Sequence, residues 1–153
     1  MNGRRQSSKH IDPALLILRL VTGVICIAHG WQKLFVLGVA GVGAAFASMG
    51  APLPTITGPA FGLLELLGGA ALIVGLWTRL AALGLACDVL GAIIVFHWKH
   101  GFFVPTGIEF VLSLFGATIA LSLAGAGGYS IDALIARRRA DAAVQPTYRS
   151  QSR

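Results

Sequence analysis

Long apolar segments alternate with short polar or glycine-rich connections along this chain. The four apolar segments cover residues 13–37, 56–77, 80–98 and 104–124. A helix that rises about 1.5 Å per residue needs about 20 apolar residues to cross a hydrocarbon core ~30 Å thick. Each segment has about that length. The pattern therefore predicts an all-α fold, an integral membrane bundle of four transmembrane helices over residues 13–124.

The rest of the chain is predicted to form three short pieces outside the membrane. Residues 1–12 make a basic N-terminal tail. Residues 125–139 begin with glycines that end the last helix and continue as a short amphipathic segment. Residues 140–153 have the polar composition of a disordered basic tail.

Composition supports the membrane assignment. Hydrophobic residues make up 56% of the chain and charged residues 12%, whereas a soluble domain has about 25% charged residues. This argues against a water-soluble, nucleic-acid-binding or disordered protein. The net charge is +6, and most positive residues lie near the two ends: Arg4, Arg5, Lys9, Arg137, Arg138, Arg139, Arg149 and Arg153. Because basic flanks of membrane helices stay in the cytoplasm, both termini are predicted to be cytoplasmic (N-in/C-in).

Each predicted helix carries one stripe of small or polar residues at spacings of three and four, which places the stripe on one helix face. The four stripes are Arg19, Thr22, Cys26, His29 and Lys33; Gly58, Gly62, Glu65 and Gly69; Gly84, Asp88, Gly91 and Val95; Thr106, Glu109, Ser113 and Gly116. Small residues let membrane helices approach closely. All four stripes are therefore expected to face inward.

The charged stripe residues are the candidate functional groups, because a charge at the bilayer centre costs at least about 2.5–3.5 kcal/mol and needs a partner or a watery cavity. Counting along each helix places four of them around one cavity in the outer half of the membrane: His29, Lys33, Glu65 and Glu109. Asp88 lies deeper, where it meets either Arg19 in a structural ion pair or the same cavity. Three acids then face two permanent bases, so we expect a protonated His29 or one neutral carboxylic acid.

Structural roles stay open for several of these residues. Arg19 and Lys33 can extend toward water at the membrane surface, and a buried ionic network can serve only to fix helix pairing. His97 and His100 are interpreted as solvated residues at the membrane interface. The sequence offers no further ligands that would make these two histidines part of a metal site.

Motifs for cofactor chemistry are missing from the sequence. It contains no phosphate loop, nucleophile elbow, zinc-protease motif or dinucleotide fingerprint, and no evident flavin, haem or iron–sulfur motif. Cys26 and Cys87 lie within apolar segments and are interpreted as small core residues, with a redox pair between helices as the alternative.

Five short stretches resemble motifs of the DoxX family, in the same order along the chain. They are residues 29–33 (HGWQK, similar to HGxxK), 61–69 (FGLLELLGG, similar to GxxExxGG), 75–79 (GLWTR, similar to GLxTR), 107–109 (GIE, similar to GxE) and 125–132 (GAGGYSID, similar to GxGxxSxD). The resemblance implies a small four-helix protein of the bacterial plasma membrane. Family members are often named as oxidoreductases, partly through relatives attached to a thiosulfate:quinone oxidoreductase, and others are linked to redox-stress assemblies.

These observations lead to one main hypothesis, a membrane subunit of an oxidoreductase system that binds quinone in its polar cavity. His29 and either Glu65 or Glu109 would exchange protons with the quinone head group, and Lys33 would stabilise its negatively charged form. A soluble or membrane redox protein would supply the electrons. The alternatives are a non-enzymatic membrane adaptor, and a small-solute or proton transporter that would require a homodimer.

Overall fold

The computed structural model describes the backbone of residues 3–151 and the side chains of residues 10–143. Within this part all regular structure is helical, and there is no strand. The α-helices are α1 (Gly3–Trp31), α2 (Gly38–Ser48), α3 (Pro54–Val74), α4 (Thr78–Ala92), α5 (Glu109–Ala124) and α6 (Ile131–Gln151). A π-helical segment, Gln32–Val36, extends α1. A second one, Ile93–His97, extends α4 and leads into a 3-10 turn, Trp98–His100.

Three helical stretches are long and apolar enough to cross a membrane: His10–Val36, Pro54–Val74 and Thr78–His100. They correspond to the first three predicted spans. The fourth predicted span, residues 104–124, is represented by α5, an apolar helix of 16 residues that begins only at Glu109. Residues 101–108 form turns instead, closed by hydrogen bonds from the Glu109 amide to the Phe102 carbonyl and from the Ile108 amide to the Gly101 carbonyl.

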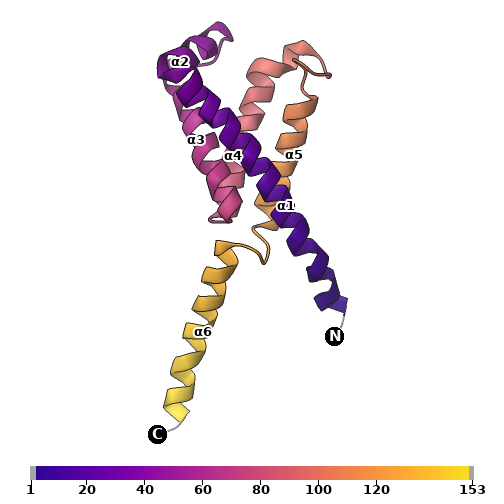
Figure 1. The fold of residues 1–153 in the computed structure, drawn as a ribbon, viewed down its shortest axis with the longest axis vertical. Helices are drawn as coiled ribbons and strands as arrows, with labels where there is room; N and C mark the ends of the chain where they lie inside the picture. The colour runs from indigo at the N-terminus through magenta and orange to yellow at the C-terminus, as the bar shows by residue number, and fades with distance from the viewer. Residues whose placement is uncertain (1–2, 152–153) are drawn as a thin grey trace.

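The helices run up and down between two ends of the molecule (Figure 1). Both described ends of the chain lie at one end, together with the turn between α3 and α4. The short helix α2 and the turns before α5 lie at the opposite end. In the core, a cluster of buried residues draws on α1, α3, α4 and α5: Cys26, Leu72, Ala82, Leu85 and Leu121.

Helices α1 and α3 are in backbone contact at two pairs of glycines. A Cβ on Gly23 would lie 2.7 Å from the Gly69 carbonyl oxygen, and a Cβ on Gly30 would lie 2.6 Å from that of Gly62. Going from the first pair to the second, the residue number rises by seven in α1 and falls by seven in α3. The two helices are therefore antiparallel, and the same faces stay in contact over two turns. Only glycine permits this approach.

The inward face of α5 differs from the predicted one. Its buried residues are Val111, Thr118 and Leu121. Three residues of the predicted stripe, Thr106, Ser113 and Gly116, are exposed. Thr106 lies in the turns before α5 and not in the helix. Ser113 and Gly116 lie in α5, but the face that is buried carries Leu121, which packs with residues of α4.

Backbone hydrogen bonds to two acidic side chains tie the segment after α5 to the rest of the fold. The Asp132 carboxylate accepts from the amides of Trp77 (2.8 Å) and Thr78 (3.0 Å) and so caps α4. The Asp12 carboxylate of α1 accepts from the Gly128 amide at 2.7 Å. These bonds connect α1, the α3–α4 turn and the start of α6.

Arg19 belongs to this same end of the molecule. It is fully buried, with 1% of its surface exposed, and its Nη2 donates to the Tyr129 carbonyl at 2.7 Å. The predicted pairing of Arg19 with Asp88 is therefore not formed. Asp88 lies ten residues into α4, about 15 Å along the helix axis from the α3–α4 turn.

Both terminal pieces are helical further than the sequence predicted. Residues 3–12 continue α1 instead of forming a separate tail. Helix α6 passes the expected end at Arg139 and runs to Gln151, where a disordered tail was predicted from residue 140. Residues 152 and 153 of that tail lie outside the described part.

Replacing Gly69 with alanine should destabilise the fold, because the new Cβ would meet the backbone of α1. We expect a loss of about 1–3 kcal/mol, measured as a lower midpoint of thermal unfolding in detergent. Gly116→Ala is the matched control, since nothing lies within 4 Å of a Cβ at that position. A Gly69→Ala variant as stable as the control would show that the two backbones do not touch.

Replacing Asp132 with alanine should weaken the start of α4 by about 0.5–2 kcal/mol, the usual effect of losing a helix cap. The amides of Trp77 and Thr78 should then exchange hydrogen with solvent faster, as measured by hydrogen–deuterium exchange. Asp141→Ala, at an exposed position of α6, serves as control. Unchanged exchange at both amides in Asp132→Ala would contradict the capping role.

Candidate functional site

A cavity of about 380 Å³ lies toward the end of the molecule that is away from the termini. We call it the Lys33–Glu65 cavity. Its polar lining residues come from α1, α3, α4 and the segments that follow α4: His29, Lys33, Glu65, Asp88, His97, His100 and Thr106. Its apolar walls include Phe46, Phe61, Phe96 and Phe110. Four of the five residues predicted to bind a ligand therefore meet here.

An ion pair between Lys33 and Glu65 is the central interaction of the cavity. The Lys33 Nζ and Glu65 Oε1 atoms are 2.5 Å apart, and the side chains are 21% and 12% exposed. Lys33 lies beside Gly62, where an added Cβ would be 3.1 Å from the Lys33 Cβ. Glu65 is three residues further along α3, so the long lysine side chain extends by about one turn of α3 to reach the carboxylate. The other carboxylate oxygen, Glu65 Oε2, is buried with no hydrogen-bond partner.

Asp88 and His29 complete the charged group. Asp88 is 4% exposed and lies near enough to Glu65 and Lys33 for their charges to act on it. His29 is exposed at the edge of the cavity, with its ring centre 6.2 Å from that of Phe110. With both acids and Lys33 ionised, the cavity would carry one excess negative charge, so a single proton shared by the carboxyl groups balances it.

Two π-helical segments shape the cavity. One contains Lys33 and the other contains Phe96 and His97. A π-turn adds a residue to the helical turn and shifts the direction of the side chains that follow, and such turns are frequent at functional sites. Phe46 of α2 completes the wall, with its ring centre 5.0 Å from that of Phe96 and 6.1 Å from that of Phe61.

His97 and His100 line the cavity, although the sequence was interpreted to place them in solvent at the membrane interface. Nδ1 of His97 lies 2.9 Å from the Thr106 carbonyl oxygen, and Nδ1 of His100 lies 2.7 Å from that of Phe96. A carbonyl oxygen only accepts, so each Nδ1 carries the proton and each Nε2 is left to bind or accept. The spacing of Asp88, Ala92, Phe96 and His100 by four residues is the signal that could have assigned His100 to the cavity.

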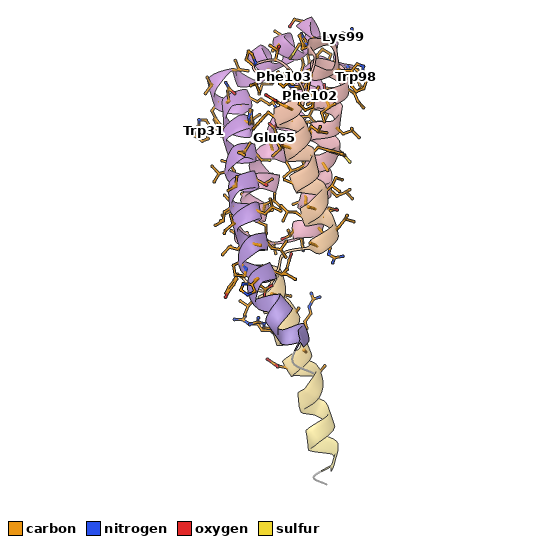
Figure 2. The ribbon with its side chains drawn as sticks, turned by 90° about the vertical axis from the view of Figure 1, so that its right-hand side faces the viewer. Trp31, Glu65, Trp98, Lys99, Phe102 and Phe103 are labelled. Carbon is orange, nitrogen blue, oxygen red and sulfur yellow. The ribbon has the colours of Figure 1, made fainter. Side chains whose placement is uncertain are left out.

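Glu109 does not line the cavity. It occupies the first turn of α5, and its Oε1 accepts a hydrogen bond from the Val104 amide at 2.8 Å. A carboxylate is favourable there because the N-terminal end of a helix is partly positive. Its role in the structure is to hold the turns before α5, which carry Phe102 and Phe103. Trp98 and Lys99 of the preceding 3-10 turn lie at the same end of the molecule (Figure 2).

The remaining candidate groups do not extend the site. Cys26 is buried and Cys87 is exposed, and both are free thiols. Among the described residues, no group of three or more histidine, cysteine, aspartate or glutamate side chains is placed to hold a metal ion.

The fold and this cavity define a class of protein: an all-helical membrane protein with a charged cavity between its helices. The DoxX family profile matches residues 14–98, a stretch that contains Lys33, Glu65 and Asp88. The chain belongs to the DoxX family.

Three bacterial proteins are similar to this chain over most of their length. The protein named putative oxidoreductase CatD of Bacillus subtilis (strain 168) is 30% identical and aligns with 84% of this chain and 91% of its own. Inner membrane protein YqjF of Escherichia coli (strain K12) is 32% identical and aligns with 83% of this chain and 95% of its own. Uncharacterized membrane protein Rv3486 of Mycobacterium tuberculosis is 28% identical and aligns with 82% of this chain and 83% of its own. No solved structure matches.

Replacing Lys33 with methionine should destabilise the protein by about 3 kcal/mol, because Glu65 would remain as an unpaired buried charge. The double variant Lys33→Met/Glu65→Met should recover most of this loss. A double-mutant cycle of unfolding free energies in detergent measures the coupling. Lys99→Met, which removes an exposed lysine, is the control. Additive effects of the two substitutions would show that the ion pair contributes no coupling.

Proposed function

We propose that this protein is a membrane subunit of an oxidoreductase system and that the Lys33–Glu65 cavity binds the head group of a quinone. The observation that carries the proposal is Glu65 Oε2, a buried carboxylate oxygen without a partner at a cavity lined by aromatic rings. A buried acceptor of this kind is costly unless a donor reaches it. The similarity to a protein named as an oxidoreductase supports the same class of function.

The cavity has the chemical character that a quinone requires. Its volume of about 380 Å³ lies within the usual range of small-molecule sites, about 300–1,000 Å³. Phe46, Phe61 and Phe96 offer apolar surface to a flat ring. Polar groups gather on one side, at Lys33, Glu65 and Asp88.

Each charged side chain has a distinct task in this proposal. Lys33 Nζ donates a hydrogen bond to a head-group oxygen and stabilises negative charge on it. Glu65 accepts a hydrogen bond from a head-group hydroxyl through Oε2, and it shares one proton with Asp88. His29, exposed at the cavity edge, passes protons between these carboxyl groups and water. The bound quinone supplies an acceptor for two electrons and two protons.

The electrons must come from another protein, because the sequence carries no flavin, haem or iron–sulfur motif of its own. We propose a soluble or membrane redox protein as this partner.

We further propose four membrane spans with both termini in the cytoplasm of a bacterium. Helix α5 shares the buried core cluster with the three candidate spans, through Leu121. Its 16 residues make a helix about 24 Å long, and the turns before it, rich in aromatic residues, fit the membrane interface. Basic residues at both termini support the cytoplasmic assignment. In this orientation the Lys33–Glu65 cavity lies in the outer half of the plasma membrane.

The test is mass spectrometry of lipids and small molecules that copurify with the protein in mild detergent. We expect a quinone at near one equivalent in the wild type and its loss in Glu65→Gln and His29→Ala, with folding checked by circular dichroism. Glu109→Gln is the matched control: it also neutralises a glutamate of the bundle, but one outside the cavity, and the amide oxygen can still accept from Val104.

Two results would contradict the proposal. If the wild type carries only the background of bulk lipid, the cavity does not hold a quinone, and an adaptor for partner proteins becomes the better hypothesis. If Glu109→Gln loses the quinone as completely as Glu65→Gln, the binding site is not this cavity.

A further inference from the structure

A second cavity, of about 590 Å³, lies at the end of the molecule that carries the termini. We call it the Arg79 cavity. It is an open cavity, lined by residues of the turn between α3 and α4, the end of α5 and the start of α6; these segments are drawn in Figure 1. Its lining includes Trp77, Arg79, Leu80, Ser130 and Asp132. The proposed quinone chemistry uses none of these residues.

Arg79 is the positive group of this cavity. Its side chain packs against Gly125: a Cβ added to that glycine would lie 3.0 Å from the Arg79 Nε atom. Among the described residues Arg79 makes no ion pair. The Asp132 carboxylate also lines the cavity, but its two oxygens accept the Trp77 and Thr78 amides, which offset its negative charge.

Helix α6 adds a second positive side chain on the same side. Ser130, just before α6, and Ala133 within it line the cavity. Arg137 follows Ala133 by four residues, so it lies on the same face of α6. Arg138 lies on the opposite face, about 80° from Ser130 and at least about 120° from Asp132 and Ala133 around the helix axis.

The mouth of the cavity is apolar. Trp77, Leu80 and Leu123 are 72%, 67% and 73% exposed, and they stand where α4 begins and α5 ends. Trp77 has a left-handed backbone conformation, with φ of 47°. A bulky residue with this conformation is strained and is often found at functional sites. An exposed tryptophan at the end of a membrane helix lies at the depth of the lipid headgroups.

We propose that the Arg79 cavity binds the headgroup of an anionic phospholipid. Arg79 and Arg137 bind the phosphate oxygens, and the acyl chains lie along Leu80 and Leu123. Two arginines beside an apolar mouth match a molecule that has a negative head and two hydrocarbon chains. Inorganic phosphate has the negative charge but no hydrocarbon chains.

The test is native mass spectrometry of the full-length, delipidated protein in detergent, titrated with phosphatidylglycerol, with phosphatidylcholine as the comparison lipid. We expect phosphatidylglycerol to bind in preference. Arg79→Gln and Arg137→Gln should each weaken its binding about fivefold. Arg138→Gln removes the same charge from the opposite face and should bind like the wild type. Glu65→Gln should also bind like the wild type, which separates this site from the quinone proposal.

Three outcomes would overturn the proposal. Equal binding of the two lipids by the wild type would show no preference for a negative head. Equal losses in Arg137→Gln and Arg138→Gln would show attraction to overall charge without a site. Displacement of phosphatidylglycerol by millimolar inorganic phosphate would identify free phosphate, not lipid, as the ligand.

Discussion

The direct contact between the backbones of α1 and α3 sets the geometry of the rest of the molecule. Four glycines, Gly23, Gly30, Gly62 and Gly69, allow this approach and hold the two helices in one register. The same contact places Lys33 beside Gly62, from where its side chain extends about one turn along α3 to reach Glu65 at 2.5 Å. An ion pair within a membrane is costly to form between flexible partners. Here the packing of small residues positions it before any electrostatic attraction is needed.

The charged side chains serve different purposes at the two ends of the molecule. At the end with the termini, Asp12 and Asp132 accept backbone amides and Arg19 donates to a carbonyl. These side chains are used to join α1, the α3–α4 turn and α6. At the other end, Glu65 keeps a buried oxygen without a partner, and two histidines leave Nε2 uncommitted. Buried atoms without a partner also occur at the first end, at Arg19 Nε and Nη1 and at Thr78 Oγ1. What distinguishes Glu65 Oε2 is that its side chain lines a cavity that a ligand could enter.

Sequence patterns predicted the parts of the structure that depend on regular helices. Spacings of three and four residues grouped His29 with Lys33, and counting along the helices placed Glu65 at the same cavity. For Asp88 they left open whether it meets this cavity or Arg19; in the structure it lines the cavity. The pattern was wrong at Glu109, because hydrophobicity does not show that residues 101–108 leave the helix. It also could not locate the partner of Arg19, the Tyr129 carbonyl, which follows from how the chain folds back after α5. Long-range backbone contacts of this kind leave no periodic signal.

The π-helical segments at Gln32–Val36 and Ile93–His97 also constrain how this cavity can change in evolution. A π-turn is equivalent to one residue inserted into an α-helix. Deleting a single residue there would restore a regular helix and remove the wide turn, so that different side chains would face the cavity at this point, while the helix on either side keeps its register. The packed glycine face would stay where it is. Relatives could therefore acquire a different cavity lining through one codon lost or gained, with every contact between α1 and α3 retained.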